Sequence, residues 1–337
     1  MRRQMGCQMR LIGSGLWSVL APDLAGTRAA LADSRRGLRR QRGFLGDDFK
    51  PQLTAFDGEL GAQAAPDRMQ QLATLALDDL AGALPDLPPG PLALALLLPE
   101  PAPEEGLDQA TLTELGRDLA SLASSRIGRN VARPALHLDG AVGLAATLNA
   151  HASALMQAPL LVLAVDTLAC RRRLLTRLDA SALFSDANPW GMVPGEGAAA
   201  LLLGPGPAEA PHIAGFALER EPIGEADPGD SDYGAITRAC WTALPEDSRP
   251  VTRWLTDWNN SRYRAAEMSY LRLRIGEVLA DGTEPDHLAL RLGETGAAGP
   301  AMALAIHGFE AGGRILLTSG APGSNLRAVV VIDGPAP

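Results

Sequence analysis

Short apolar runs that stop at a strand-breaking residue recur along the whole chain. Residues 92–98 are continuously apolar and end at Pro99, and residues 159–165 form a second run that closes at Asp166. Runs of this length are typical of strands buried on both faces of a sheet. Further strands are expected at 9–18, 135–139, 198–203, 212–218, 251–256, 287–292, 314–319 and 327–332.

Segments whose apolar residues recur at helical spacing lie between these runs. Residues 66–84 carry Met69, Leu72 and Leu80 close to a helical period. Further helices are predicted near 107–123, 140–156, 231–243, 262–280 and 297–309, and the arginine-rich stretch 28–42 is expected to be a helix followed by a solvated loop. Alternation of helices with short buried strands indicates an α/β fold.

A proline- and glycine-rich linker at 204–211 divides this pattern. Strands and helices alternate on both sides of it, so we expect two similar α/β halves, 1–204 and 212–337, that arose by internal duplication.

Composition excludes several kinds of protein. The net charge of −9 and the aromatic content of 4% argue against a nucleic-acid-binding surface. The apolar runs are far shorter than a membrane span, and the charged N-terminus lacks the apolar segment of a signal peptide. Cys7, Cys170 and Cys240 form no CxxC pair, which fits a reducing compartment. We therefore expect a soluble cytoplasmic protein.

The sequence offers no convincing cofactor or metal site. The five histidines have no HxxxH or HExxH spacing, so no metal is predicted. Gly13 and Gly15 match the first two glycines of a dinucleotide-binding turn, but its third glycine is replaced by Ser18. No cofactor is expected.

Four segments, in order, resemble β-ketoacyl synthases of the thiolase superfamily. They are LIGSGLWSVLAP, LHLDGAVGLAATLNAHASALMQAPLLVLAVDTL, GMVPGEGAAALLLG and the glycine turn TSGAPGSN followed by LRAVVV. The third is the most specific match, and the fourth contains Ser319 and Asn325. The resemblance implies a thiolase-like fold, with two duplicated α/β halves in a layered α-β-α-β-α architecture.

The same resemblance implies that the family's Cys-His-His catalytic set is lost. Its nucleophilic cysteine, at a tight turn before a buried helix, corresponds to Gly140. The two histidine positions correspond most nearly to Trp258 and Glu294. The family's condensation chemistry is therefore not expected, and the adjacent Asp139 is expected to cap the helix.

Several polar residues remain where the family has its pocket. Asp257 and Asn259 lie in the dense polar segment TDWNNSRYRAAE, which either binds a polar ligand or forms a hydrogen-bonded loop. Glu196 is expected to be a structural hydrogen-bonding residue. The candidate pocket therefore comprises Asp139, Gly140, Glu196, Asp257, Trp258, Asn259, Glu294, Ser319 and Asn325.

The leading functional hypothesis is a non-condensing partner or scaffold subunit, like a chain-length factor, in a fatty-acid or polyketide-type pathway. The resemblance implies a homodimer, or a heterodimer with a β-ketoacyl synthase, formed through residues 134–139. Acyl carrier protein or an acyl thioester is a further candidate partner, although the acidic net charge favours at most a local arginine patch for the carrier. The alternative is a repurposed enzyme or an acyl-thioester sensor using a polar pocket around Asp257 and Glu294.

Overall fold

The computed structural model of this chain describes residues 9–334, except positions 59, 61–62, 86, 88–89, 132–133, 156 and 310–311. Cys7 and the charged N-terminal stretch lie outside these residues. A ten-stranded sheet dominates the described part, in the order β10-β9-β11-β12-β8-β1-β7-β6-β4-β5. A separate small hairpin pairs β2 (Arg39–Leu45) with β3 (Pro51–Thr54).

The large sheet consists of two topologically identical halves. The first contains β1 (Arg10–Ser18), β4 (Ala93–Leu97), β5 (Ala135–His137), β6 (Leu160–Thr167) and β7 (Glu196–Gly204). The second contains β8 (His212–Arg220), β9 (Val251–Thr256), β10 (Pro285–His287), β11 (Arg314–Ala321) and β12 (Leu326–Asp333).

In each half, the strands lie in the spatial order first, fifth, fourth, second, third. The fifth strand pairs antiparallel with the first and fourth, and the second strand pairs parallel with the fourth and third. The halves meet where β1 and β8 share one residue pair, Arg10 with His212. The predicted duplication of an α/β unit is confirmed.

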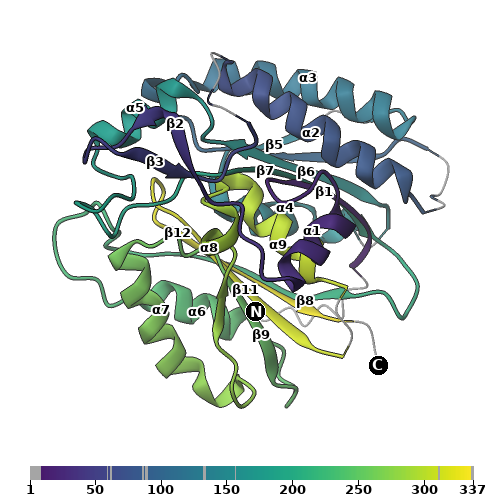
Figure 1. Ribbon diagram of the computed structural model, residues 1–337. Helices are drawn as coiled ribbons and strands as arrows, with labels where there is room; N and C mark the ends of the chain where they lie inside the picture. The colour runs from purple at the N-terminus through teal and green to yellow at the C-terminus, as the bar shows by residue number, and fades with distance from the viewer. Residues whose placement is uncertain are drawn as a thin grey trace.

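Helices separate and cover the two halves of the sheet, as Figure 1 shows. Helices α2 and α3 cover one outer face, α6 and α7 cover the other, and α4 and α9 lie between the halves. The predicted α-β-α-β-α layering is therefore present. The helices are α1 (Leu24–Ala32), α2 (Ala65–Gly82), α3 (Gln109–Ile127), α4 (Gly143–Leu155), α5 (Arg171–Asp179), α6 (Gly234–Ala243), α7 (Arg262–Ile275), α8 (Ala289–Leu292) and α9 (Gly299–His307).

The core explains why the central strands are continuously apolar. All eight residues of β6 and all nine of β7 are buried, because α2 packs on one face and the central layer on the other. Helix α9 is buried from Pro300 to His307, and every residue of this run except His307 is apolar. Each large side chain that α9 buries contributes about 1.5–3 kcal/mol.

The glycine-rich start of the chain differs from its predicted form. Residues 13–15 are not a turn after a short strand but the middle of β1, which continues to Ser18. A Cβ atom at Gly15 would lie 2.3 Å from the backbone oxygen of Ala76 and from the backbone nitrogen of Leu80. Gly15 therefore lets α2 cross β1 at very short distance.

Three other segments also differ from expectation. Residues 39–45 form strand β2 rather than a solvated loop, a strand so polar that only Gln41 and Phe44 are buried. Residues 289–292 form the short helix α8, because a brief apolar run alone cannot distinguish strand from helix. Helix α5, which opens with three arginines, lies between two predicted strands, where no helix was expected.

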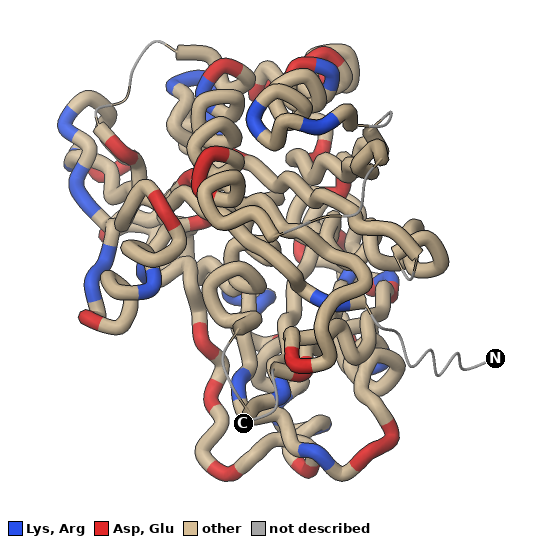
Figure 2. The backbone as a smooth tube through the Cα atoms, turned by 90° about the vertical axis from the view of Figure 1, so that its right-hand side faces the viewer, with Lys and Arg blue, Asp and Glu red and all other residues tan. Residues whose placement is uncertain are grey.

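Among the described helices, none is long and apolar enough to cross a membrane. Figure 2 shows acidic and basic positions interspersed over the tube, without one broad basic face.

Candidate functional site

Two equivalent turns introduce the two central helices. Gly140 begins a 3₁₀ turn, Gly140–Val142, that leads into α4, and Gly296 begins the turn Gly296–Ala298 that leads into α9. The φ angles of the two glycines are +54° and +50°. The two turns contact each other at the centre of the molecule. The resemblance associates catalysis with this region.

Glu100 occupies the space beside the Gly140 turn. A Cβ atom at Gly140 would lie 3.5 Å from Cγ of Glu100, so a side chain there would point at this carboxylate. The carboxylate also lies against Gly323, whose added Cβ would be 3.0 Å from Oε2. Burial raises the pKa of Glu100, and hydrogen bonds from the backbone N–H groups of Gly323 and Ser324 oppose that rise. Glu100 thus connects the first-half turn to the β11–β12 hairpin.

Asp139 does not cap the following helix as predicted, because its side chain accepts no capping hydrogen bond. Its Oδ2 instead lies 3.6 Å from Nδ1 of His137, the last residue of β5. The ring of His151 on α4 meets that of His137 edge-on at 6.0 Å. The negative charge of Asp139 also contributes to the raised pKa of Glu100.

Glu294 lies beside the second-half turn, in a different environment. Its Oε1 accepts a hydrogen bond from the Gly296 N–H at 2.7 Å, and its Oε2 accepts one from Nδ2 of Asn259 at 2.5 Å. Burial, followed by the negative charge of Asp257, raises the pKa of Glu294 to about 7. A carboxyl with this pKa can accept or donate a proton near neutral pH.

The cavity at Glu294 is small. It has a volume of about 30 Å³ and is lined by residues that include Asp257, Glu294, Thr295 and Pro300. A water molecule requires about 10–15 Å³ measured in this way. The cavity therefore has room for two or three waters.

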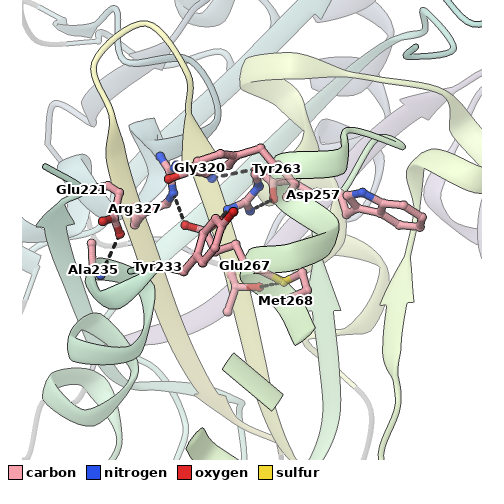
Figure 3. A network of polar contacts seen from close by, with 12 residues as sticks. Glu221, Tyr233, Ala235, Asp257, Tyr263, Glu267, Met268, Gly320 and Arg327 are labelled. Atoms are coloured by element: carbon pink, nitrogen blue, oxygen red, sulfur yellow. Dashed lines mark hydrogen bonds and ion pairs between the residues drawn. The ribbon is translucent and has the colours of Figure 1, made fainter. Parts of the chain in front are cut away.

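Asp257 belongs to a buried ionic network, which Figure 3 shows. Its carboxylate pairs with Arg264 and accepts the Gly320 N–H at 2.7 Å. Arg264 also pairs with Glu267, whose other oxygen accepts from Nε of Arg327 at 2.6 Å. These contacts support the hydrogen-bonded-loop interpretation of the polar segment, with Asp257 also lining the small cavity.

Trp258 is turned toward β10. Its indole N–H donates to the Ser261 carbonyl at 2.8 Å, and its ring meets that of His287 edge-on at 4.7 Å. Burial lowers the pKa of His287. A histidine therefore does lie in this part of the site, although it comes from β10 and not from the segment with which the motif was compared.

Glu196 has the structural role expected of it. Its side chain is completely buried and accepts hydrogen bonds from Arg68, the Thr167 hydroxyl and the Asp57 N–H. It therefore fixes three segments around the start of β7 without facing the small cavity.

The two remaining candidates lie on the β11–β12 hairpin. Ser319 is buried within β11. Asn325 has a φ of +55° at the hairpin turn and donates to Asp227 Oδ2 at 2.7 Å. Asn325 thus ties the hairpin to the 221–227 loop, and the hairpin in turn holds Glu100.

Some of the candidate residues therefore form two groups, one at each turn, and the others make structural contacts elsewhere. Asp257, Asn259 and Glu294 gather at the second-half turn, while Asp139 and Gly140 gather at the first. The motif comparison missed Glu100 and His287, because each is distant in sequence from the residue that it contacts. Among the described residues, no three His, Cys, Asp or Glu side chains are placed to hold a metal ion.

No protein-family model matches this sequence, and no curated protein matches it. Solved structures, in contrast, match its fold. A β-ketoacyl synthase from Burkholderia phymatum STM815 has a TM-score of 0.68 and 16% identity, covering 99% of this chain and 100% of that one.

Two solved complexes are similar to the same extent. A ketosynthase with its chain length factor from Xenorhabdus doucetiae has a TM-score of 0.67 and 15% identity, with 100% of both chains covered. A type II polyketide synthase ketosynthase in complex with its acyl-carrier protein has a TM-score of 0.73 and 13% identity, covering 97% of this chain and 99% of that one. The chain therefore has the thiolase-like fold of the ketosynthases, as the resemblance implied.

Proposed function

We propose that this chain is a non-condensing, β-ketoacyl-synthase-like subunit that acts as a partner or scaffold, as a chain-length factor does, in a fatty-acid or polyketide-type pathway. The observation that carries this proposal is the Gly140 turn. Glycine offers no nucleophile there, and the Glu100 carboxylate lies where a side chain at position 140 would extend. An acyl group would have no attachment point at this turn, and beyond a Cβ atom it would meet the Glu100 side chain.

The second-half turn supports the same function. Glu294 and Asn259 bond to each other, Asp257 bonds to Arg264, and the cavity beside them is about 30 Å³. Condensation requires room for two thioester substrates next to groups that stabilise developing negative charge. The carboxylates of Asp257 and Glu294 would repel developing negative charge, and the cavity that they line is small.

The edge of the sheet supports the role of a partner. Strand β5 pairs with β4 and is the last strand at its end of the large sheet. The resemblance assigns dimer contacts to this strand. The His137 carbonyl accepts from the Leu98 N–H, so the backbone groups of Leu136, one residue earlier, face the open edge. A strand from a homodimeric or ketosynthase partner would pair with these groups.

This role is tested by mixing the purified chain with the ketosynthases encoded in the same genome and measuring mass by light scattering. We expect a stoichiometric complex with one of them, or a homodimer of the chain alone. Leu136→Pro should abolish the assembly, because it removes the edge N–H that a partner strand needs. Leu136→Ala, the matched control, keeps that N–H and should still assemble. The proposal would be overturned if the chain stayed monomeric alone and in the presence of every ketosynthase tested.

The acyl carrier protein is proposed as a second partner. One structure of the same fold was solved with an acyl-carrier protein bound to its ketosynthase. The β2–β3 hairpin of this chain presents Arg39, Arg40 and Arg42 on an exposed surface, which is a local basic patch on an acidic protein. Such a patch attracts an acidic partner in a salt-dependent manner.

A second candidate function rests on the raised pKa of Glu294. A carboxyl of pKa about 7 next to Asp257 could perform acid–base chemistry or sense a small ligand. The test is the double variant Asp257→Asn, Glu294→Gln. An activity toward acyl or amide compounds that this variant abolishes would favour the enzyme, and an activity that it leaves unchanged would exclude this cavity as the site.

A further inference from the structure

A second, larger hollow lies at the other end of α9. The Glu294 cavity adjoins the first residues of α9, whereas this hollow adjoins its last residues, with α1 packed alongside (Figure 1). Its volume is about 400 Å³, within the range of 300–1,000 Å³ that is common for small-molecule sites. We call it the basic hollow, and it is lined by Arg28, Leu31, Ala32, Arg253, Asp286, Arg291, Ile306, His307 and Phe309.

Cationic side chains dominate the polar wall of the basic hollow. Arg253 from β9 and Arg291 from α8 both pair with Asp286 of β10, so two guanidinium groups share one carboxylate. Arg28 adds a third guanidinium from α1. The polar residues of the lining are therefore three arginines, one aspartate and His307, in a protein whose net charge is −9.

The positive charges are held in fixed positions. Arg28 donates to the Ala305 carbonyl at 2.6 Å and to the Ile306 carbonyl at 2.8 Å, which satisfies the C-terminal end of α9. The side chains of Arg253, Arg291 and Asp286 are 36%, 26% and 25% exposed, so water screens them only partly. Pre-positioned guanidinium groups bind a carboxylate without a large loss of side-chain entropy.

The other wall of the basic hollow is apolar. Leu31 of α1 and Ile306 of α9 line it together with Phe309, whose ring lies 5.7 Å from the Arg28 guanidinium. A small inorganic anion would leave this wall in contact with water. A hydrocarbon body placed against it would gain about 25 cal/mol for each Å² that it covers.

We propose that the basic hollow binds a small amphipathic carboxylate, with the charged group at Arg253 and Arg291 and the hydrocarbon body against Leu31, Ile306 and Phe309. This site is separate from both central turns and does not depend on the proposed partner function. Asp286 has an opposing effect, since it orients the two arginines and weakens their attraction for an anion.

Isothermal titration calorimetry of the full chain with octanoate tests the proposal. Octanoate should bind saturably, whereas octanol, which lacks the charge, and inorganic phosphate, which lacks the hydrocarbon, should bind at least tenfold more weakly. Arg253→Gln combined with Arg291→Gln should weaken octanoate binding at least tenfold. Arg272→Gln, which removes an exposed arginine paired with Glu284 on another surface, is the matched control and should change nothing.

A second variant keeps the test decisive if the double variant fails to fold. Asp286→Asn removes the competing carboxylate and should strengthen octanoate binding several-fold. The proposal is overturned if octanoate does not bind, if phosphate or octanol binds equally well, or if Asp286→Asn weakens binding.

Discussion

The turns at Gly140 and Gly296 share a backbone and differ in what surrounds it. Both follow a residue with nearly the same conformation, φ −108° and ψ 12° at Asp139 and φ −106° and ψ 10° at Thr295. A Cβ atom at Gly140 would make an ordinary contact of 3.5 Å with Glu100, whereas one at Gly296 would lie 2.0 Å from Oδ2 of Asp166. Duplication thus preserved the turn geometry, while only the first turn kept room for a side chain.

The difference indicates which turn is structural. Asp166 accepts the Ala297 N–H at 3.1 Å, and its other oxygen pairs with Arg173 at 2.7 Å, so the second turn is part of a buried ionic cluster. At the first turn, the nearby carboxylate is Glu100, which is only half-buried and belongs to a loop between prolines. The second turn is therefore fixed by the fold, and the first is the one that could have carried chemistry.

The largest effect should come from Gly296→Ala. The added methyl group would displace Asp166 from Ala297 and Arg173, and alanine is disfavoured at a φ of +50°. We expect the free energy of unfolding to fall by about 4 kcal/mol, or the protein not to fold. Urea denaturation measures this change. Gly276→Ala is the control, because nothing lies within 4 Å of its added Cβ and its φ is −53°. If both variants lost the same free energy of unfolding, the tight packing around Gly296 would be refuted.

An intermediate effect should appear in the pH dependence of the free energy of unfolding, to which Glu294 contributes. Its pKa rises from 4.5 to about 7 on folding, so the folded state binds more protons between these values. Stability should therefore fall as pH rises from about 4.5 to 7, by on the order of 1–3 kcal/mol. Glu294→Gln should remove that slope in denaturation at pH 5 and pH 8, while Glu284→Gln, at an exposed ion pair, should retain it. An unchanged slope in Glu294→Gln would mean that Glu294 does not titrate in this range.

The smallest effect should come from Gly140→Ala. The added methyl group meets no atom closer than 3.5 Å, so the main penalty is the positive φ, about 1 kcal/mol. Thermal denaturation should show a modest shift in Tm and an unchanged fold. If Gly140→Ala were as damaging as Gly296→Ala, the first turn would be as tightly packed as the second.

The sequence predicted the fold well because a strand that is buried on both faces appears in the sequence as a continuous apolar run. The runs at 92–98 and 159–165 correspond to β4 and β6, and 251–256 corresponds to β9. The failures were local, as in β2, whose arginines face solvent along a strand that buries only Gln41 and Phe44.

The site was less predictable because its contacts are tertiary. Motif comparison identified positions 140, 258 and 294, but not what faces them. Glu100 reaches Gly140 from the end of β4, and His287 reaches Trp258 from β10. The topology explains both, since Leu97 pairs with His137 on the β5 strand that precedes Gly140, and Thr256 pairs with His287. These neighbours become visible only when the strand order is known.

The most direct test of the account is whether the isolated chain forms a new carbon–carbon bond. The purified protein is incubated with acyl and malonyl thioesters, and 3-ketoacyl product is measured by mass spectrometry beside an active ketosynthase. We predict no product above the buffer level, because Gly140 carries no nucleophile and the Glu100 side chain lies next to this turn. Product formation that Glu100→Gln or Glu294→Gln abolishes would contradict the account, since it would assign the chemistry to this chain and not to a contaminant.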